Sequence, residues 1–379
     1  MKSERPIAID LFCGAGGLGL GVEQAGFDVA AAFDALQFNI DTHDRNFPYT
    51  NAFSVDLTKT DGSKLLQLAK LKRNSIDLVV GGPPCQGFSV GGKRDLNDKR
   101  NLLIYRFATL VKQIAPKYFI MENVQGLMSK HSLLVLKSFV TRVKHAGYRV
   151  VEPVQVLDAA DFGVPQRRKR VIVLGYRKDL VAPKYPEVIT PLGGRGRLKR
   201  VTVKDAISDL PKVHEFDELF ECDIFSGRLR IPKRKYARIL RGVENDDSDF
   251  SLPRKSINCL SGFLRTSHSD AVIKRFRKTT PGKSEPVSRY IRLDWQGVSP
   301  TLRAGTGVDH GSHTAPRPIH PEQPRCITTR EAARLHSFPD WFVFHGTRWH
   351  DFRQIGNSVP PRLARAIANQ VLKALRQNG

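Results

Sequence analysis

Short apolar runs alternate with longer amphipathic stretches from residue 7 to about residue 180. Runs of four to eight apolar residues are typical of buried strands, and the stretches between them are long enough for helices. The alternation predicts an α/β fold with a doubly wound, mostly parallel sheet that has helices on both faces. The expected strands are 8–12, 29–33, 76–80, 118–122 and 171–175, and the clearest helices are 102–114 and 133–145.

The regular pattern fades after Tyr176 into sequence that is rich in proline, glycine and arginine, which predicts a domain boundary near residue 180. Helical order returns near the end of the chain. Thr329, Arg330 and Glu331 can begin a helix that continues through His336, and residues 361–377 read as an amphipathic helix. We therefore expect a second, smaller domain between the two regular regions.

The charge of the chain points to a polyanionic partner. The formal net charge is +24 and the pI is near 10.1, and an excess of this size attracts polyanions such as nucleic acid. A basic protein with merely solvated charges is the alternative. Two groups of cations fall in the central region, where solvated faces are again the alternative: Arg228, Arg230, Lys233, Arg234, Lys235, Arg238 and Arg241, and then Lys274, Arg275, Arg277 and Lys278.

Cysteine and histidine usage gives no metal site. The five cysteines contain no Cys-x-x-Cys pair, which argues against a zinc site or a disulfide framework and favours reduced, intracellular thiols. His310, His313 and His320 are expected to be surface loop histidines. No apolar stretch reaches the length of about 20 residues that crosses a bilayer, and no apolar signal region precedes Ile7. We expect neither a membrane nor export.

A glycine-rich turn follows the first strand, where DLFCGAGGLG spans residues 10–19. Gly14, Gly16 and Gly19 match the dinucleotide-binding fingerprint, and the acidic Asp34 lies twenty residues after Gly14. Any cofactor that contains adenosine would fit, so NAD and S-adenosylmethionine both qualify, and a turn kept only for packing is the alternative. Asp56 can accept from an adenine amino group or can cap its own loop.

The segment GGPPCQGFS at residues 81–89 holds one thiol, Cys85, in a loop that two prolines stiffen. A nucleophile must be held in one orientation, so such a loop suits covalent catalysis, although a buried loop cysteine is the common alternative. Glu122 ends another expected strand, at the edge where doubly wound folds assemble their sites. It can then meet Cys85, or it can only cap its strand.

Three further polar residues, Gln166, Arg168 and Arg170, occupy alternating positions before the last expected strand. Alternating side chains share one face, and a face of hydrogen-bond donors suits an anionic or carbonyl target. The alternative is a run of arginines that only binds phosphate.

Together these motifs resemble the DNA (cytosine-5)-methyltransferase family. Six motifs occur in the order of that family and span nearly the whole chain: DLFCGAGGLG at 10–19, GPPCQ at 82–86, ENV at 122–124, Gln166-x-Arg168-x-Arg170, TREAAR at 329–334 and QIGNSVPP at 354–361. The resemblance implies a catalytic domain of residues 1–180 and 352–379 that binds S-adenosylmethionine. It also implies an inserted target-recognition domain, residues 181–351, that binds double-stranded DNA.

The resemblance also implies a role for each site residue. Cys85 would add to C6 of a flipped-out cytosine, Glu122 would contact N3 and the exocyclic amine, and Arg168 would hold O2, and Arg170 is counted with them as catalytic. Residues 290–307 would form structural core of the small domain. The cofactor positions are Phe12, Gly14, Gly16, Gly17, Leu18, Asp34, Asp56, Pro84, Leu103, Asn357 and Ser358. This chain has Ala35 where the family often has an aromatic residue, so Phe12 or another ring would have to compensate.

The resulting hypothesis is a sequence-specific DNA cytosine C5 methyltransferase of bacterial restriction–modification type, monomeric and cytoplasmic, associated with the nucleoid through DNA. A cognate restriction endonuclease that acts on the same site is the expected protein partner. The alternatives are a tRNA cytosine C5 methyltransferase, a non-catalytic DNA-binding relative and an NAD-dependent oxidoreductase. Intact Cys85, Glu122 and Arg168 disfavour the last two.

Overall fold

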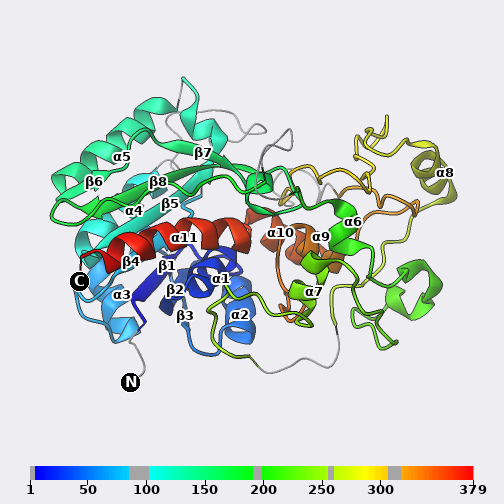
Figure 1. The fold of residues 1–379 in the computed structure, drawn as a ribbon, viewed down its shortest axis with the longest axis horizontal. Helices are drawn as coiled ribbons and strands as arrows, with labels where there is room; N and C mark the ends of the chain where they lie inside the picture. The colour runs from blue at the N-terminus through cyan, green and yellow to red at the C-terminus, as the bar shows by residue number, and fades with distance from the viewer. Residues whose placement is uncertain are drawn as a thin grey trace.

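The computed structural model describes residues 5–84, 102–130, 132–190, 199–254, 260–305 and 317–378. Within them, one eight-stranded sheet forms the centre of the larger lobe (Figure 1). Its strands run in the order β3-β2-β1-β4-β5-β8-β6, and β7 also pairs with β8. The bounds are β1 Ile7–Leu11, β2 Asp28–Asp34, β3 Asn51–Ser54, β4 Leu78–Gly81, β5 Tyr118–Val124, β6 Tyr148–Val150, β7 Gln155–Asp158 and β8 Lys169–Arg177.

The sheet confirms the predicted architecture. Neighbours from β3 to β5 are parallel, whereas β8 runs antiparallel to β5, β6 and β7. All five expected strands are present. The sequence pattern missed β3, β6 and β7, which are short and carry exposed polar residues such as Asn51 and Arg149.

The two faces of the sheet bury different sets of side chains, because successive residues of a strand point to opposite faces. In β4 and β5, Val79 and Phe119 join one apolar core with helices α3 (Gly62–Ala69), α4 (Leu102–Ile114) and α5 (Leu133–His145). Val80 and Ile120 join another core with α1 (Gly17–Gln24) and α11 (Pro361–Arg376). The C-terminal helix therefore belongs to the larger lobe, where Figure 1 shows it crossing the sheet.

The smaller lobe has a core of its own, which runs from Val203 to Ile355 and includes Leu293 and Leu302 from the 290–307 segment. Three side chains of the larger lobe, Ala15, Leu20 and Phe47, join it, so the two lobes are packed together. The remaining helices are α2 Gln37–Asn46, α6 Val203–Ile207, α7 Lys235–Arg241, α8 Asp270–Lys278, α9 Thr329–Leu335 and α10 Arg348–Asn357. None of the helices in the described ranges is long and apolar enough to span a membrane.

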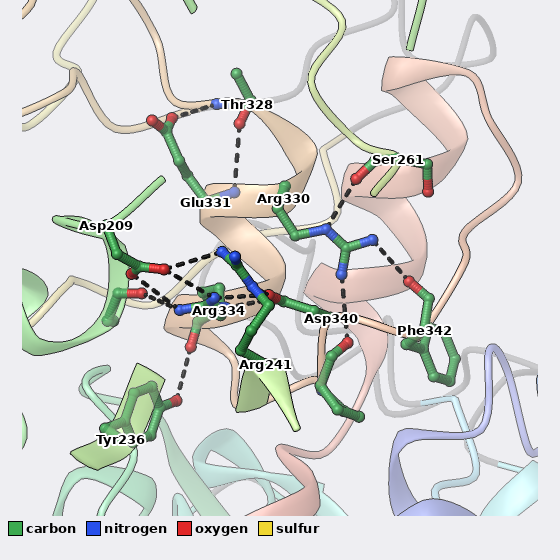
Figure 2. A network of polar contacts seen from close by, with 12 residues as sticks. Asp209, Tyr236, Arg241, Ser261, Thr328, Arg330, Glu331, Arg334, Asp340 and Phe342 are labelled. Carbon is green, nitrogen blue, oxygen red and sulfur yellow. Dashed lines mark hydrogen bonds and ion pairs between the residues drawn. The ribbon is translucent and has the colours of Figure 1, made fainter. Parts of the chain in front are cut away.

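Helix α9 lies at the centre of this lobe although it carries charged side chains. Thr328 and Glu331 form a capping box that begins the helix. Arg330 donates to the carbonyl oxygens of Ser261, Pro339 and Phe342, and Arg334 pairs with Asp209 and Asp340 (Figure 2). Each of the two arginines has at most 1% of its surface exposed. The helix thus connects distant loops through buried hydrogen bonds.

A segment of the small-lobe sequence reaches back over the larger lobe. Glu23 of α1 accepts hydrogen bonds from Leu252 N (2.8 Å) and Arg254 Nη2 (2.6 Å). Asp246 pairs with Arg365 of α11 at 2.8 Å. These contacts fasten residues 246–254 across the two helices that cover one face of the sheet, which the chain's alternating pattern did not predict.

Candidate active site at the carboxyl ends of the strands

Most of the predicted site residues lie at one edge of the sheet. The parallel strands β1, β2, β4 and β5 all end at this edge. The glycine turn follows β1, Asp34 is the last residue of β2, Pro84 follows β4, and Asn123 is the next-to-last residue of β5. Strand β8 is antiparallel to β5, so it begins at the same edge. The open α/β arrangement therefore brings the motifs from both ends of the chain together, as expected for this class of fold.

Gly16 and Gly17 of the glycine turn are closely packed, whereas Gly14 faces open space. Gly14 and Gly16 have φ values of +55° and +94°, which favour glycine. A Cβ on Gly16 would lie 2.5 Å from the Phe47 ring, and one on Gly17 would lie 2.5 Å from the Val359 carbonyl oxygen. Nothing lies within 4 Å of the Cβ position of Gly14. The turn is thus closed on the side of α1 and open at Gly14.

Asp34 holds the open part of the turn in place. Its Oδ2 accepts a hydrogen bond from Gly14 N at 3.0 Å, and its Oδ1 accepts from Leu36 N and Asn39 Nδ2 at 2.9 and 3.1 Å. The carboxylate is therefore fixed between the end of β2 and the turn after β1. Phe12, with φ of +57°, is half-buried against the core on the other side.

A small cavity opens beside Gly14. It is lined by Gly14, Ala15, Leu36, Phe38, Asn39, Arg353, Gln354 and Asn357. Asn357 is exposed, whereas Ser358 is buried and its Oγ donates to the Gln354 carbonyl at 2.8 Å. The structure therefore brings the glycine turn and the QIGNSVPP motif together, with Asn357 rather than Ser358 presenting its side chain to the cavity. Leu18 is buried in the core at the start of α1.

Three other predicted cofactor residues differ in their exposure. Asp56 is exposed and its Oδ1 accepts from Thr58 N at 2.9 Å and Thr58 Oγ1 at 2.6 Å, and these hydrogen bonds lower the pKa of Asp56. The loop-capping interpretation of Asp56 is thus present in the structure. Leu103 is half-buried in the first turn of α4, and Pro84 is exposed. Cys85 directly follows Pro84 and lies outside the described residues.

Glu122 and Arg170 form an ion pair at the meeting point of β5 and β8. The Arg170 Nε lies 2.7 Å from Glu122 Oε1, and both side chains are nearly buried. The register explains the pair: Val124 is opposite Arg170, and Glu122 is two residues back along the same face. A Cβ on Gly82 would be only 3.0 Å from Glu122 Oε2, so the carboxylate lies against the loop that leads to Pro84.

Asn123 belongs to the site, although the sequence did not predict a role for it. Its Nδ2 donates to the Pro83 carbonyl oxygen at 3.1 Å, and the residue is buried. The side chain thus ties the end of β5 to the loop before Cys85. Its place beside Glu122 in the ENV motif was a signal, but the sequence alone did not show which group it would bind.

Arg168 makes contacts that the sequence did not predict. The alternation is confirmed, because Gln166 and Arg168 are buried while Arg167 and Lys169 are exposed. However, the Arg168 guanidinium is 0% exposed and donates to the carbonyl oxygens of Leu302 (3.0 Å) and Gly356 (2.7 Å). Burial also lowers its pKa. The role of Arg168 in holding a base thus stays a prediction, and Arg170 is the arginine that pairs with Glu122 in the structure.

Some cations of the two basic groups form ion pairs within the protein, and others are exposed to solvent. Arg241 is paired with Asp209 and Asp340, Arg238 with Glu244, and Arg275 with the buried Glu285. The sequence placed these three in the two groups of cations but did not show their acidic partners. The exposed cations of the two groups are Arg228, Arg230, Lys233, Arg234, Lys235, Lys274, Arg277 and Lys278.

His320 is also not a surface histidine. It is 4% exposed, its Nδ1 accepts from the backbone of Glu322 and Gln323, and burial lowers its pKa to about 4. His310 and His313 lie outside the described residues. In the described part of the chain, no group of three or more histidine, cysteine, aspartate or glutamate side chains could hold a metal ion.

Known proteins share this combination of fold and motifs. A family model described as C-5 cytosine-specific DNA methylase matches residues 7–373. The chain belongs to this family. It is 48% identical over 374 residues to the Type II methyltransferase M.XorII of Xanthomonas oryzae pv. oryzae, covering 98% of this chain and 86% of the relative. It is 34% identical to M1.HphI of Haemophilus parahaemolyticus over 96% of this chain and 86% of that protein.

A solved structure supports the same assignment. The crystal structure described as a prophage-encoded DNA modification methyltransferase of E. coli superposes with a TM-score of 0.78 at 35% identity. The match covers 98% of this chain and 99% of the other. The family resemblance and the methyltransferase activity expected from the sequence are thereby confirmed.

Proposed function

We propose that this enzyme methylates C5 of a specific cytosine in duplex DNA and serves a Type II restriction–modification system, with S-adenosylmethionine as the methyl donor. The observation that carries the proposal is the Glu122–Arg170 pair, which lies against the loop leading to Cys85. A cytosine ring offers an acceptor at O2 and a protonation site at N3, and an arginine beside a carboxylate matches this pattern. The named relatives that match most of the chain are Type II methyltransferases.

The residues around Gly14 fit an adenosine-containing methyl donor. The open position at Gly14 allows a ligand to approach the backbone, and the adjoining cavity is lined by apolar side chains and by the amides of Asn39 and Asn357. The Asp34 carboxylate ends β2 in the place where such folds hold ribose hydroxyls. Phe38 and Leu36 line the cavity and supply apolar surface where Ala35 does not. When bound, S-adenosylmethionine supplies an electrophilic methyl group on its sulfonium.

The side chains of the chain itself would prepare the base. Cytosine C5 is a poor nucleophile until the Cys85 thiolate adds to C6, which makes the ring an enamine. Glu122 would deliver or share a proton at N3 during this addition, and Arg170, which also holds Glu122 in place, would donate to O2. Once C5 carries the methyl group, its proton would pass to a base such as an ordered water molecule, and departure of the Cys85 thiolate would restore the aromatic ring.

The duplex would lie against the smaller lobe, residues 181–351. C6 is inaccessible in a stacked duplex, so the target cytosine must leave the helix at a cost of a few kcal/mol. The exposed cations of residues 228–235 and of α8 would contact phosphates, while other loops of this lobe would read base edges. One lobe that flips one base requires only a monomer. We expect the enzyme in the bacterial cytoplasm on the nucleoid, with a cognate endonuclease that cleaves the same sequence.

The proposal is tested by incubating a plasmid pool with labelled S-adenosylmethionine and mapping the modified cytosines by bisulfite-type sequencing. Protection of one cytosine within a single short sequence would support the proposal and reveal the specificity. Methyl transfer to tRNA but not to duplex DNA would refute the DNA substrate. Tight DNA binding without methyl transfer to duplex DNA or to tRNA would refute the proposed methyltransferase activity.

The salt dependence of DNA binding should show whether exposed cations of the smaller lobe contact phosphates. Replacing Arg228, Arg230 and Lys233 with glutamine is expected to reduce the slope of log K against log salt by about 0.9 for each lost phosphate contact. All three are exposed. Fluorescence anisotropy at several salt concentrations measures the slope. Lys64, which is exposed on α3 of the larger lobe, serves as the control, and an equal change for Lys64→Gln would contradict the assignment.

A further inference from the structure

Arg168 joins three segments that are far apart in the sequence. It lies two residues before Arg170, which pairs with Glu122. One end of its guanidinium donates to the Leu302 carbonyl in the small lobe, and the other donates to the Gly356 carbonyl in the QIGNSVPP motif. Gly356 directly precedes Asn357, which lines the cavity beside Gly14. The Arg168 side chain therefore lies between the base-binding pair and the wall of the donor cavity.

The segments that Arg168 holds are pressed together without intervening side chains. A Cβ on Gly356 would lie 2.3 Å from Ala304 N and 2.5 Å from the carbonyl carbon of Arg303. Backbone therefore packs on backbone, and the carbonyl groups on either side cannot reach water. A buried carbonyl group needs a hydrogen-bond donor, because leaving it unpaired costs about 1–3 kcal/mol of stability. Arg168 supplies both donors.

A second set of hydrogen bonds runs parallel to the first. Gln166 Oε1 accepts from Leu302 N at 3.0 Å, and Gln166 Nε2 lies 3.0 Å from His336 Nδ1. His336 Nε2 lies 3.0 Å from the Ser358 carbonyl oxygen. Since a carbonyl oxygen only accepts, Nε2 carries the proton and Nδ1 accepts from Gln166. The imidazole is neutral, in agreement with the burial that keeps its pKa well below the usual value.

These two sets hold the carbonyl groups on both sides of Asn357, since Arg168 binds that of Gly356 and His336 binds that of Ser358. We propose that Arg168 and His336 are positioning residues that fix Asn357 in the wall of the methyl-donor cavity. Arg168 thereby links donor binding to the β8 segment that carries Arg170. This inference rests on the proposed function, in which the cavity holds S-adenosylmethionine.

The test compares Arg168→Gln with Arg170→Gln. We would measure the Kd of S-adenosylhomocysteine by calorimetry without DNA, and the rate of methyl transfer at saturating donor and DNA. Arg168→Gln is expected to weaken S-adenosylhomocysteine binding by about ten- to a hundredfold, because two buried carbonyl groups lose their donors. Arg170→Gln is expected to leave this Kd unchanged and to lower the rate. Arg167→Gln, at an exposed neighbouring position, is the matched control and should leave the Kd unchanged.

A lowered rate with an unchanged Kd in Arg168→Gln would overturn the proposal, because Arg168 would then act on the base. If circular dichroism shows that Arg168→Gln is unfolded, His336→Phe decides. This variant removes both hydrogen bonds of the imidazole at similar volume, and a Kd raised several-fold supports the proposal, whereas an unchanged Kd overturns it. A wild-type protein that binds S-adenosylhomocysteine but methylates only RNA would refute the DNA substrate and leave this test decisive.

Discussion

Replacing Cys85 with alanine is expected to abolish methyl transfer while DNA binding remains within about twofold of the wild type. In the proposed mechanism the Cys85 thiolate converts C5 into a nucleophile, so its loss would remove covalent catalysis, and losing a nucleophile lowers turnover by at least about a thousandfold. In the proposed function, DNA affinity would rest instead on phosphate and base contacts of the smaller lobe. Transfer of labelled methyl groups and fluorescence anisotropy with the same duplex measure the two effects.

A matched control is available in the same chain. Cys222 is exposed in the smaller lobe, so Cys222→Ala should change neither quantity. A duplex that carries 5-fluorocytosine at the target position sharpens the test, because the fluorine cannot leave as a cation and the covalent complex persists. Mass spectrometry should find this complex with the wild type and Cys222→Ala but not with Cys85→Ala. Turnover retained by Cys85→Ala would contradict the mechanism.

The sheet could be predicted because its central strands are buried on both faces. Runs such as 78–80 and 118–121 are continuously apolar, and a continuous apolar run between turn signals is informative by itself. Strands β3 and β6 lie at the two ends of the strand order, where one long side of each is unpaired. Their short sequences mix exposed and buried residues, so no clear pattern of apolar and polar residues distinguishes them from loops.

The site could be predicted as a set of residues but not as a set of contacts. Gln166, Arg168 and Arg170 share a face, as the alternation requires, yet the sequence cannot say which arginine meets Glu122. That choice depends on the register in which Val124 is opposite Arg170. It also depends on Leu302 and Gly356, which lie more than a hundred residues further along the chain and take up the Arg168 guanidinium.

Charged residues were the least predictable feature. Clusters of arginine suggest solvent or phosphate, and Arg241 belongs to such a cluster in the sequence. In the structure its side chain is 9% exposed because Asp209 and Asp340 surround it. Nothing local to Arg241 marks these partners, since Asp340 is 99 residues away. Net charge therefore indicated nucleic acid as the class of ligand, whereas the contacts of individual charged residues required the fold.

Replacing Arg334 with methionine is expected to destabilise the smaller lobe by about 3–5 kcal/mol, which is the usual effect of removing one partner from a buried ion pair. Arg334 is 0% exposed, pairs with both Asp340 and Asp209, and donates to the Ala206 carbonyl at 2.8 Å (Figure 2). Burial alone would raise the pKa of Asp340, but Arg334 and its neighbours hold it at about 2. Within the described part of the chain, the variant leaves the two buried carboxylates with Arg241 as their shared ion-pair partner.

Urea unfolding followed by tryptophan fluorescence can measure this loss, because Trp295, Trp341 and Trp349, the three tryptophans of the chain, all belong to the small-lobe sequence. Arg228→Met, at an exposed arginine, is the control and should change the unfolding free energy by less than about 0.5 kcal/mol. A double variant, Arg334→Met with Asp340→Leu, removes one charge of each sign. It should be more stable than Arg334→Met alone, because the penalty comes from the unpaired charge rather than from the lost attraction. If the unfolding free energy of the double variant fell by the sum of the two single-variant losses, Arg334 and Asp340 would act independently. Helix α9 would then depend on packing instead of on its buried ion pairs.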